Sequence, residues 1–161
     1  MQIRVRRAYA YYMDIRSIVK DYLTVAQMLY LGTSHGHRPW VTTLYFAADI
    51  DLNIYWLSRR SRRHSQEVEK NSHVAGAIIL PHNYGDKVRG IQFEGEAREL
   101  IDQNAVAGRQ IYSSKYWIVE DRVMTTKEGQ DDQACYQVRP EKFVLYDEVN
   151  FPDNPSQEFK L

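Results

Sequence analysis

Hydrophobic and polar residues alternate over several short segments of the chain, which is the pattern of half-buried β-strands. These segments cover residues 26–34, 40–49, 53–58, 73–80, 88–100 and 134–148. Many of their side chains are β-branched or aromatic, as is usual in strands. The pattern predicts six or so antiparallel strands, the first three of which would follow one another as a meander.

Turn signals separate these segments. Gly36 lies at the centre of a tight turn over 35–38, and residues 49–53 form a second polar turn. A break or an edge position is also expected in the last strand, because Pro140 has no N–H to donate to a neighbouring strand.

Two other segments have helical periodicity. Residues 15–23 place apolar side chains on one face, and Asp14 is a suitable N-cap for them. The pattern over 102–116 is also helical, with Val106, Ile111 and Tyr112 as its expected apolar contacts. A third, short helix is expected after the basic run that follows residue 58, capped by Ser61 or Ser65.

The segment 88–100 has one apolar and one polar face. Gly90 and Gly95 interrupt it, and glycine inside a strand indicates a bulge or a close approach by a ligand or another backbone. Glu94 and Glu96 lie on the polar face, where exposure to solvent explains them better than acid–base catalysis.

No repeat or linker divides the chain, so we expect one domain over 1–161, with its core at about 15–148 and a loosely ordered tail over 149–161. Several antiparallel strands with inserted helices favour a mainly β fold, specifically a small β-barrel.

Composition narrows the range of functions. The 161 residues include 21 Lys and Arg against 21 Asp and Glu, so the formal net charge is zero. A nucleic-acid-binding domain is normally basic overall, which makes a dedicated one unexpected here. Cys135 is the one cysteine and no segment resembles a signal peptide or membrane span, so we expect a cytoplasmic protein without disulfides.

The strongest local signal for chemistry is a run of basic residues between a strand and a helix. Four arginines and a histidine occupy Arg59, Arg60, Arg62, Arg63 and His64. Guanidinium groups and the free N–H groups of a helix N-terminus both bind phosphate well, and Ser61 can donate another hydrogen bond. The alternative is a solvated basic turn that balances the acidic residues near the C-terminus.

Other candidate groups support no catalytic set. His35 and His37 form an H-x-H pair on a turn, but no third ligand accompanies them, so no metal site is predicted. Cys135 lies in a predicted strand and is expected to be a buried, inert thiol. Walker A, G-x-G-x-x-G and G-x-S-x-G motifs are absent.

The order of these segments resembles the pyridoxamine-phosphate-oxidase-like split β-barrel flavoproteins, over about residues 15–148. The segments that carry the resemblance are YLGTSHGHRPWVTTLYFAADIDLNIYWLS, SRRHSQEVEKNSHVAGAII, VRGIQFEGEAREL and CYQVRPEKFVLYD. The resemblance implies a homodimer of FMN-binding split barrels, with FMN at the subunit interface and no membrane association.

The resemblance also implies which residues bind the cofactor. Ser61, Arg62 and Arg63 match the group that holds the FMN phosphate. Residues matching neighbouring positions along the flavin are Thr42, Thr43, Leu44, Tyr45, Trp56, Leu57, Ser58 and Gln92, and Tyr112, Tyr116 or Trp117 would line the substrate site. The family's oxidases often have Arg near Thr42 and Gln near Gly90, so this chain departs from them at both positions.

Three functions remain open from the sequence. The leading one is a flavin-dependent oxidoreductase that acts on an unknown small molecule, although pyridoxamine phosphate itself is not expected because the oxidases' C-terminal substrate-binding segment is missing. A second is a non-catalytic module that binds a flavin, haem, a deazaflavin or no cofactor. The third is nucleic-acid binding through Arg59–Arg63.

Overall fold

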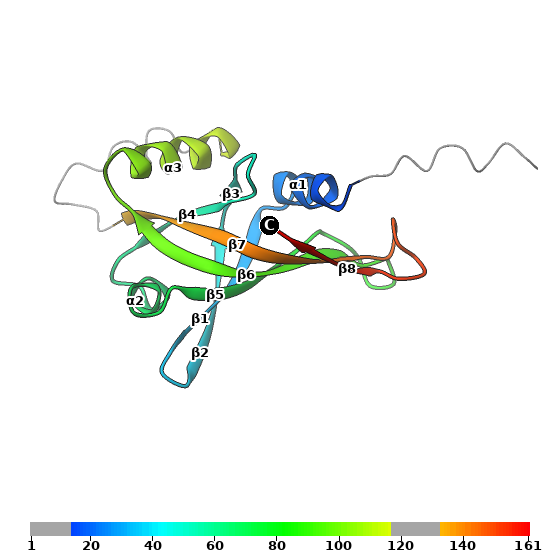
Figure 1. Cartoon of the computed structure of the whole chain (residues 1–161), viewed down its shortest axis with the longest axis horizontal. Coiled ribbons are helices and arrows are strands. Elements are labelled where there is room, and N and C mark those ends of the chain that lie inside the picture. The colour runs from blue at the N-terminus through cyan, green and yellow to red at the C-terminus, as the bar shows by residue number, and fades with distance from the viewer. Residues whose placement is uncertain (1–13, 117–132) are drawn as a thin grey trace, which may run out of the picture.

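A computed structural model describes residues 14–116 and 133–161 (Figure 1). In chain order its elements are α1 (Ile15–Val25), β1 (Met28–His35), β2 (Arg38–Tyr45), β3 (Ala47–Ala48), β4 (Ile54–Arg59), α2 (Arg63–Lys70), β5 (His73–Ile79), β6 (Arg89–Leu100), α3 (Asp102–Lys115), β7 (Gln133–Asp147) and β8 (Ser156–Lys160). None of the described helices is long and apolar enough to cross a membrane.

The described strands form one antiparallel sheet in the order β2-β1-β5-β6-β7-β4-β3, with β8 added beside β7. Its two edge strands, β2 and β3, are separated in the chain by Phe46 alone. The two edges of the sheet therefore approach each other at this residue. The result is a split β-barrel with inserted helices, as the strand pattern and the resemblance predicted.

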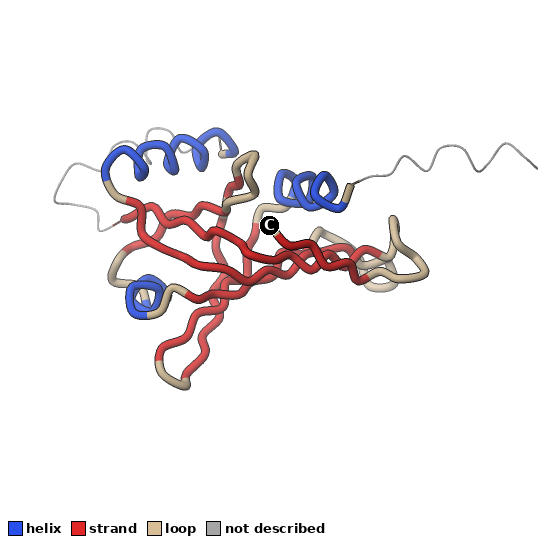
Figure 2. The backbone as a smooth tube through the Cα atoms, viewed as in Figure 1, coloured by secondary structure: helices blue, strands red, loops and turns tan. Residues whose placement is uncertain are grey.

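Figure 2 shows how the helices cover this curved sheet. In that view α1 and α3 lie on its upper side, α2 lies below it, and the β1–β2 hairpin projects away from the barrel. The strands β6 and β7 extend in another direction and carry β8. The core lies inside the curve and contains inward-facing side chains such as Leu29, Leu31, Phe46, Trp56, Phe93 and Phe143.

The predicted meander is wrong, because the segment 40–49 is two strands. β2 pairs with β1 at one edge, whereas β3 pairs with β4 at the other. Phe46 is completely buried at the corner between them. A continuous apolar pattern fits both strands, and it does not show that the chain changes its pairing partner there.

The close approaches predicted at two glycines are confirmed. A Cβ on Gly95 would overlap the Arg139 carbonyl oxygen, and one on Gly90 would lie 2.9 Å from the Ile78 oxygen. The β6–β7 register shifts between Glu94 and Gly95, so a bulge is present there as well. Pro140 falls where β7 pairs with neither β4 nor β8, so its missing N–H interrupts neither of those pairings.

The helix predictions hold in part. Asp14 caps α1 by accepting a hydrogen bond from the Arg16 N–H. α2 begins at Arg63 with Arg62 as its N-cap, so neither serine has the predicted capping role. In α3, Val106 is exposed, whereas Ile111 and Tyr112 make apolar contacts.

The C-terminal tail is more ordered than predicted. β8 pairs with β7 from Lys142 to Tyr146, and Phe151 and Phe159 pack against the core. The outer half of β7 would otherwise lack a partner on that side. Charged residues separate these phenylalanines from other apolar positions, which hides the strand in the sequence.

A buried carboxylate ties α1 to this tail. Asp147 is inaccessible to solvent and accepts hydrogen bonds from the Tyr22 hydroxyl at 2.5 Å, the Val149 N–H at 2.9 Å and the Asn150 side chain at 2.6 Å. Burial by itself would raise the Asp147 pKa, but the hydrogen bonds from Tyr22, Asn150 and Val149 outweigh it and hold the pKa below its usual value. Asp147 is therefore ionised at neutral pH.

We expect Tyr22→Phe to lower the free energy of unfolding at neutral pH by about 1.5–3 kcal/mol, the usual contribution of a hydrogen bond to a charged group. A group with a lowered folded pKa contributes stability above its unfolded pKa, and that stability is lost as pH falls through the folded pKa. The difference between the variant and the native chain should therefore shrink in acid. Urea unfolding at about pH 7 and about pH 3 measures it; an equal difference at both pH values would contradict the role of Asp147.

Candidate anion and cofactor site

The turn between β4 and α2 ends in a helix N-terminus without a side-chain cap. The Arg62 N–H donates to the Arg59 carbonyl at 3.1 Å, and the Gln66 N–H makes an early helical bond to the Arg62 carbonyl at 3.0 Å. Arg62 provides no capping side chain. The N–H groups of the first turn can therefore bind an anion from outside the helix.

The arginines of this turn differ in their surroundings. Arg60 donates to both carboxylate oxygens of Glu99, and Arg63 donates through Nε to Glu67 at 2.8 Å. Arg59 and Ser61 also interact with other groups. Arg62 is exposed beside the first turn of α2. The basic run is thus a set of differently anchored groups rather than a uniform solvated patch.

The inner side of α2 is polar and is fixed to two strands. The buried Ser58 hydroxyl lies 2.7 Å from His64 Nε2, and the buried Thr33 hydroxyl donates to Glu67 Oε2 at 2.6 Å. Burial lowers the pKa of His64, and the positive charge of Arg62 lowers it further. For Glu67, burial raises the pKa, but hydrogen bonds from Thr33 and Arg63 bring it below its usual value. The helix is therefore anchored by a neutral imidazole and an ionised carboxylate.

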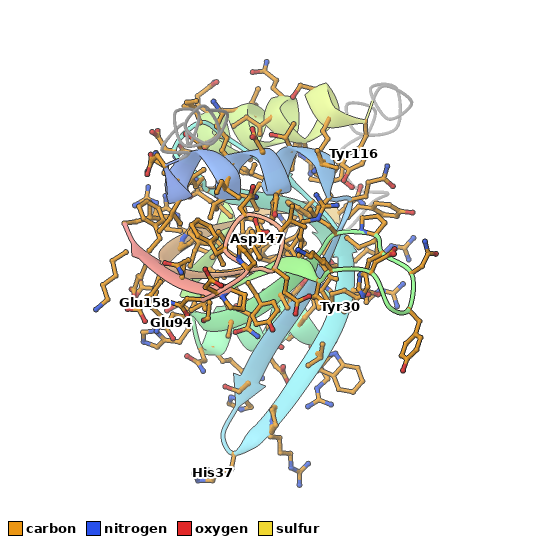
Figure 3. All side chains as sticks on the ribbon, turned by 90° about the vertical axis from the view of Figure 1, so that its right-hand side faces the viewer. Tyr30, His37, Glu94, Tyr116, Asp147 and Glu158 are labelled. Atoms are coloured by element: carbon orange, nitrogen blue, oxygen red, sulfur yellow. The ribbon has the colours of Figure 1, made fainter. Side chains whose placement is uncertain are left out.

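A groove lies on the outer face of the sheet, on the other side of β1 and β2 from α2. It consists of two adjoining hollows of about 460 Å³ each. Its floor contains the small residues Gly32, Ala75 and Ala77, with Tyr30 and Val41 beside them. Figure 3 shows Tyr30 on β1, Glu94 across the sheet and His37 at the tip of the projecting hairpin.

The groove and the basic turn lie on opposite faces of the edge strand β2, because Trp40 shares the inner face with Thr33 and Thr42. Trp40 lines one end of the groove, and the Arg63 guanidinium carbon lies 4.3 Å from the centre of the Trp40 ring. Thr33, which holds Glu67, lines the same end. The basic turn and the groove therefore flank the same stretch of β2 from its two faces.

The predicted residues on β2 and β6 divide between the two faces of the sheet. Thr43 is registered with Tyr30, which is registered with Ala77 and in turn with Gln92, so these side chains form one row across the outer face. Tyr45 also faces outward and is 55% exposed. Thr42 and Leu44 point to the inner face, because successive side chains of a strand alternate.

The predicted residues on β4 do not reach the groove. Trp56 is fully buried and stacks on Tyr136, with the ring centres 5.2 Å apart. Leu57 packs toward α3, and Ser58 lies beside His64. Of the aromatic residues suggested for a substrate site, Tyr112 is buried and Tyr116 contacts Tyr45. Trp117 lies outside the described residues.

Sequence reasoning did not single out the groups that hold the turn in place. Glu67 lies four residues after Arg63, a helical spacing at which opposite charges pair, so this contact had a signal in the sequence. The hydrogen bond between Thr33 and Glu67 joins residues 34 positions apart, so no local pattern in the sequence indicates it. The same holds for Trp40 beside Arg63.

Cys135 and Glu94 lie as the sequence suggested. Cys135 is buried, and burial raises its thiol pKa to about 11, so it is a poor nucleophile. Glu94 is exposed and pairs with Lys142 at 2.8 Å. Within the described residues, no three His, Cys, Asp or Glu side chains are grouped to hold a metal ion.

Comparison with known proteins gives distant relatives. A UPF0306 protein of Pasteurella multocida is 25% identical over 99 residues, which cover 61% of this chain and just under two thirds, 66%, of that protein. A UPF0306 protein of Klebsiella pneumoniae is 24% identical over 143 residues, covering 88% of this chain and 87% of the relative. No protein-family profile matches the chain.

Solved structures support the fold. A candidate pyridoxamine 5′-phosphate oxidase of Listeria innocua has a TM-score of 0.63 at 20% identity, covering 85% of this chain and 99% of the other. The heme storage protein HutZ of Vibrio cholerae has a TM-score of 0.64 at 16% identity, with 77% and 88% covered. A heme-binding protein of Mycobacterium smegmatis reaches 0.69 at 11% identity, with 88% and 57% covered. The chain therefore shares the split-barrel fold of these proteins.

The closeness of Arg62 to His64 can be tested by titration. We expect Arg62→Ala to raise the pKa of His64, because a positive charge that opposes its protonation is removed. The pKa should stay below its ordinary value, since burial is the larger cause. NMR titration of the His64 ring measures this, with Lys70→Ala at the other end of α2 as the control. An unchanged His64 pKa in Arg62→Ala would contradict the described turn.

Proposed function

We propose that this chain binds FMN, with the phosphate at the N-terminus of α2 and the flavin in the groove on the other side of the edge strand β2, and that it is a flavin-dependent oxidoreductase acting on a small molecule. The observation that carries the proposal is that the uncapped, arginine-flanked helix end and the groove flank the same stretch of the edge strand β2, with Trp40 on the helix side and Val41 on the groove side. Ser61, Arg62 and Arg63 are the residues proposed for the phosphate.

The chemistry of the donor set fits a phosphate monoester. Arg62 and Arg63 supply two positive charges, and the first turn of α2 supplies N–H groups that no side chain caps. Each interaction is stronger for a doubly charged oxyanion than for a neutral group. Arg63 also retains its two terminal guanidinium nitrogens after its bond to Glu67 through Nε.

The groove fits a planar ring. Small residues on β1 and β5 leave room over the backbone, and Tyr30 and Val41 offer apolar contact beside it. Gln92 and Thr43 lie in the same row across the sheet and can hydrogen bond to a heterocycle. Each hollow, at about 460 Å³, is within the usual size of a cofactor or ligand pocket.

Bound FMN supplies hydride and electron transfer, chemistry that side chains do not provide. The protein's own groups bind and orient it. The basic turn holds the phosphate, the outer-face side chains set the plane of the ring, and the exposed aromatic residues keep water from one side of it. This division of roles needs no catalytic triad, and Thr42 and Leu44 support the groove from the inner face of β2.

The outer face also suits contact with a second copy of the chain. Its exposed side chains include Tyr30, Val41, Tyr45, Ile79 and Tyr146, which are 41–62% accessible. Apolar residues gathered on one sheet face mark an interaction surface. A homodimer through this face would cover the groove and enclose the flavin between two copies.

Haem is the second candidate cofactor, and one observation favours it. His73 is exposed and lines the end of the groove, where its imidazole would hold haem iron. Two of the solved structures with this fold are named as heme proteins. Haem and FMN would occupy the same groove, so they are alternatives for one site.

We expect the purified protein to retain FMN on a desalting column and to show flavin absorbance. The double variant Arg62→Ala/Arg63→Ala should weaken FMN binding by at least about tenfold, since each charge-assisted hydrogen bond contributes about 1.5–3 kcal/mol. Quenching of flavin fluorescence measures the affinity. The control is Lys20→Ala/Lys87→Ala, which removes the same charge from exposed positions away from the groove.

Equal FMN affinity of the native chain and the arginine variant would reject the proposed phosphate site. If the protein retains no flavin but takes up haem, and His73→Ala abolishes the haem spectrum, haem is the cofactor instead. Retention of neither group would leave the protein a module without either cofactor.

The dimer proposal has its own test. We expect Tyr30→Glu to convert a dimer to a monomer, because it places a charge at the centre of the proposed interface. Tyr84→Glu is the matched control, since Tyr84 is fully exposed on the loop after β5. Light scattering after size-exclusion chromatography measures the mass. A native monomer, or dissociation by Tyr84→Glu alone, would exclude this interface.

A further inference from the structure

The guanidinium of Arg63 is held from two directions. Its Nε donates to Glu67 Oε1 at 2.8 Å, and its Cζ lies over the Trp40 ring at 4.3 Å from the ring centre. Arg63 is itself exposed. An exposed arginine normally samples many rotamers, so two contacts of this kind restrict both the position and the plane of its head group.

Glu67 is in turn fixed by a group on the barrel. The Thr33 hydroxyl donates to Glu67 Oε2 at 2.6 Å, and Thr33 and Glu67 are only 4% and 6% exposed. The two oxygens of the carboxylate thus have different partners, one on β1 and one on α2. A rigid strand is therefore connected to an exposed cation through one buried side chain.

The two terminal nitrogens of the Arg63 guanidinium indicate what this arrangement can bind. No described residue accepts a hydrogen bond from its two terminal nitrogens, which can together bind two oxygens of a phosphate. We propose that Thr33 and Glu67 are positioning residues, which orient the Arg63 guanidinium against Trp40 for a bidentate contact with a phosphate oxyanion. This inference rests on the proposed function and adds what prepares the site before the phosphate arrives.

Glu67 has two opposing effects on an anion at this site. Its negative charge repels the phosphate, so removing the charge alone would tighten binding. Its hydrogen bond orders Arg63, so removing that bond would weaken binding. The sign of the change on substitution therefore distinguishes a positioning residue from a simple counter-charge.

Three variants separate these effects. Thr33→Val removes the hydroxyl that holds Glu67 without changing any charge. Glu67→Ala removes both the charge and the positioning bond. Glu67→Gln removes the charge but can accept from Arg63 through its oxygen and donate to Thr33 through its amide nitrogen. Glu69→Ala, an exposed carboxylate on the same helix, is the control for charge.

The readout is the ratio of the affinities for FMN and riboflavin, which differ by the phosphate. We expect Thr33→Val and Glu67→Ala to weaken FMN binding by about threefold to tenfold, the range of one hydrogen bond, with riboflavin binding unchanged. Glu67→Gln should bind FMN at least as tightly as the native chain. A variant that merely destabilises the fold would affect both ligands alike.

Tighter FMN binding by Glu67→Ala, or native FMN binding by Thr33→Val, would overturn the inference. If Glu67→Ala does not fold, as checked by thermal denaturation, Thr33→Val decides the question because it preserves side-chain shape. The proposal of FMN as cofactor can fail separately. In that case inorganic phosphate is titrated against the Arg63 Nε–H resonance, and phosphate binding that weakens in Thr33→Val supports the positioning role, whereas no phosphate binding rejects it.

Discussion

The corner at Phe46 is the constraint on which the rest of the structure depends. Because one residue separates the strand at one edge of the sheet from the strand at the other, the sheet must curve until its edges meet. Phe46 stabilises this corner by being completely buried, and the Tyr116 hydroxyl donates to its carbonyl at 2.7 Å. The curvature leaves the β1–β2 hairpin projecting beside α2, which brings Trp40 to Arg63. The proposed phosphate site is thus a consequence of barrel closure as well as of the basic run.

The burial of polar groups under α2 is a second constraint. A helix that only covered a barrel end would present apolar residues to it, because an ionised carboxylate is costly to remove from water. α2 packs Val68 into the core but also buries His64 and Glu67, and both of these have partners on strands. Hydrogen bonds offset the desolvation and define one position of the helix more strictly than apolar contacts alone would. A site that recognises a phosphate benefits from this precision, since misplaced donors lose most of their interaction energy.

Local features of the fold could be predicted from the sequence, whereas features that depend on distant partners could not. The Asp14 cap and the glycines of β6 act through neighbouring backbone geometry, and their residue types carry that information. The division of 40–49 at Phe46 depends on which strands lie beside it, and the order of β8 depends on the unpaired half of β7. In the site, the arginines were identifiable from their spacing. Their separate partners, Glu99 on β6 for Arg60 and Glu67 within α2 for Arg63, follow from the folded chain.

Strand alternation also determines which residues of a matching segment can contact a cofactor through their side chains. Four consecutive residues of β2 match positions assigned to the flavin, but a strand presents only alternate side chains to one face. Thr43 and Tyr45 share the outer face with Gln92, whereas Thr42 and Leu44 face inward. Since the groove lies on the outer face, direct contact through side chains falls to the first group, and the second acts by packing or through the backbone. An arginine at the position of Thr42 would point inward as well, toward the face that Trp40 and α2 occupy, so its absence leaves the outer groove unchanged.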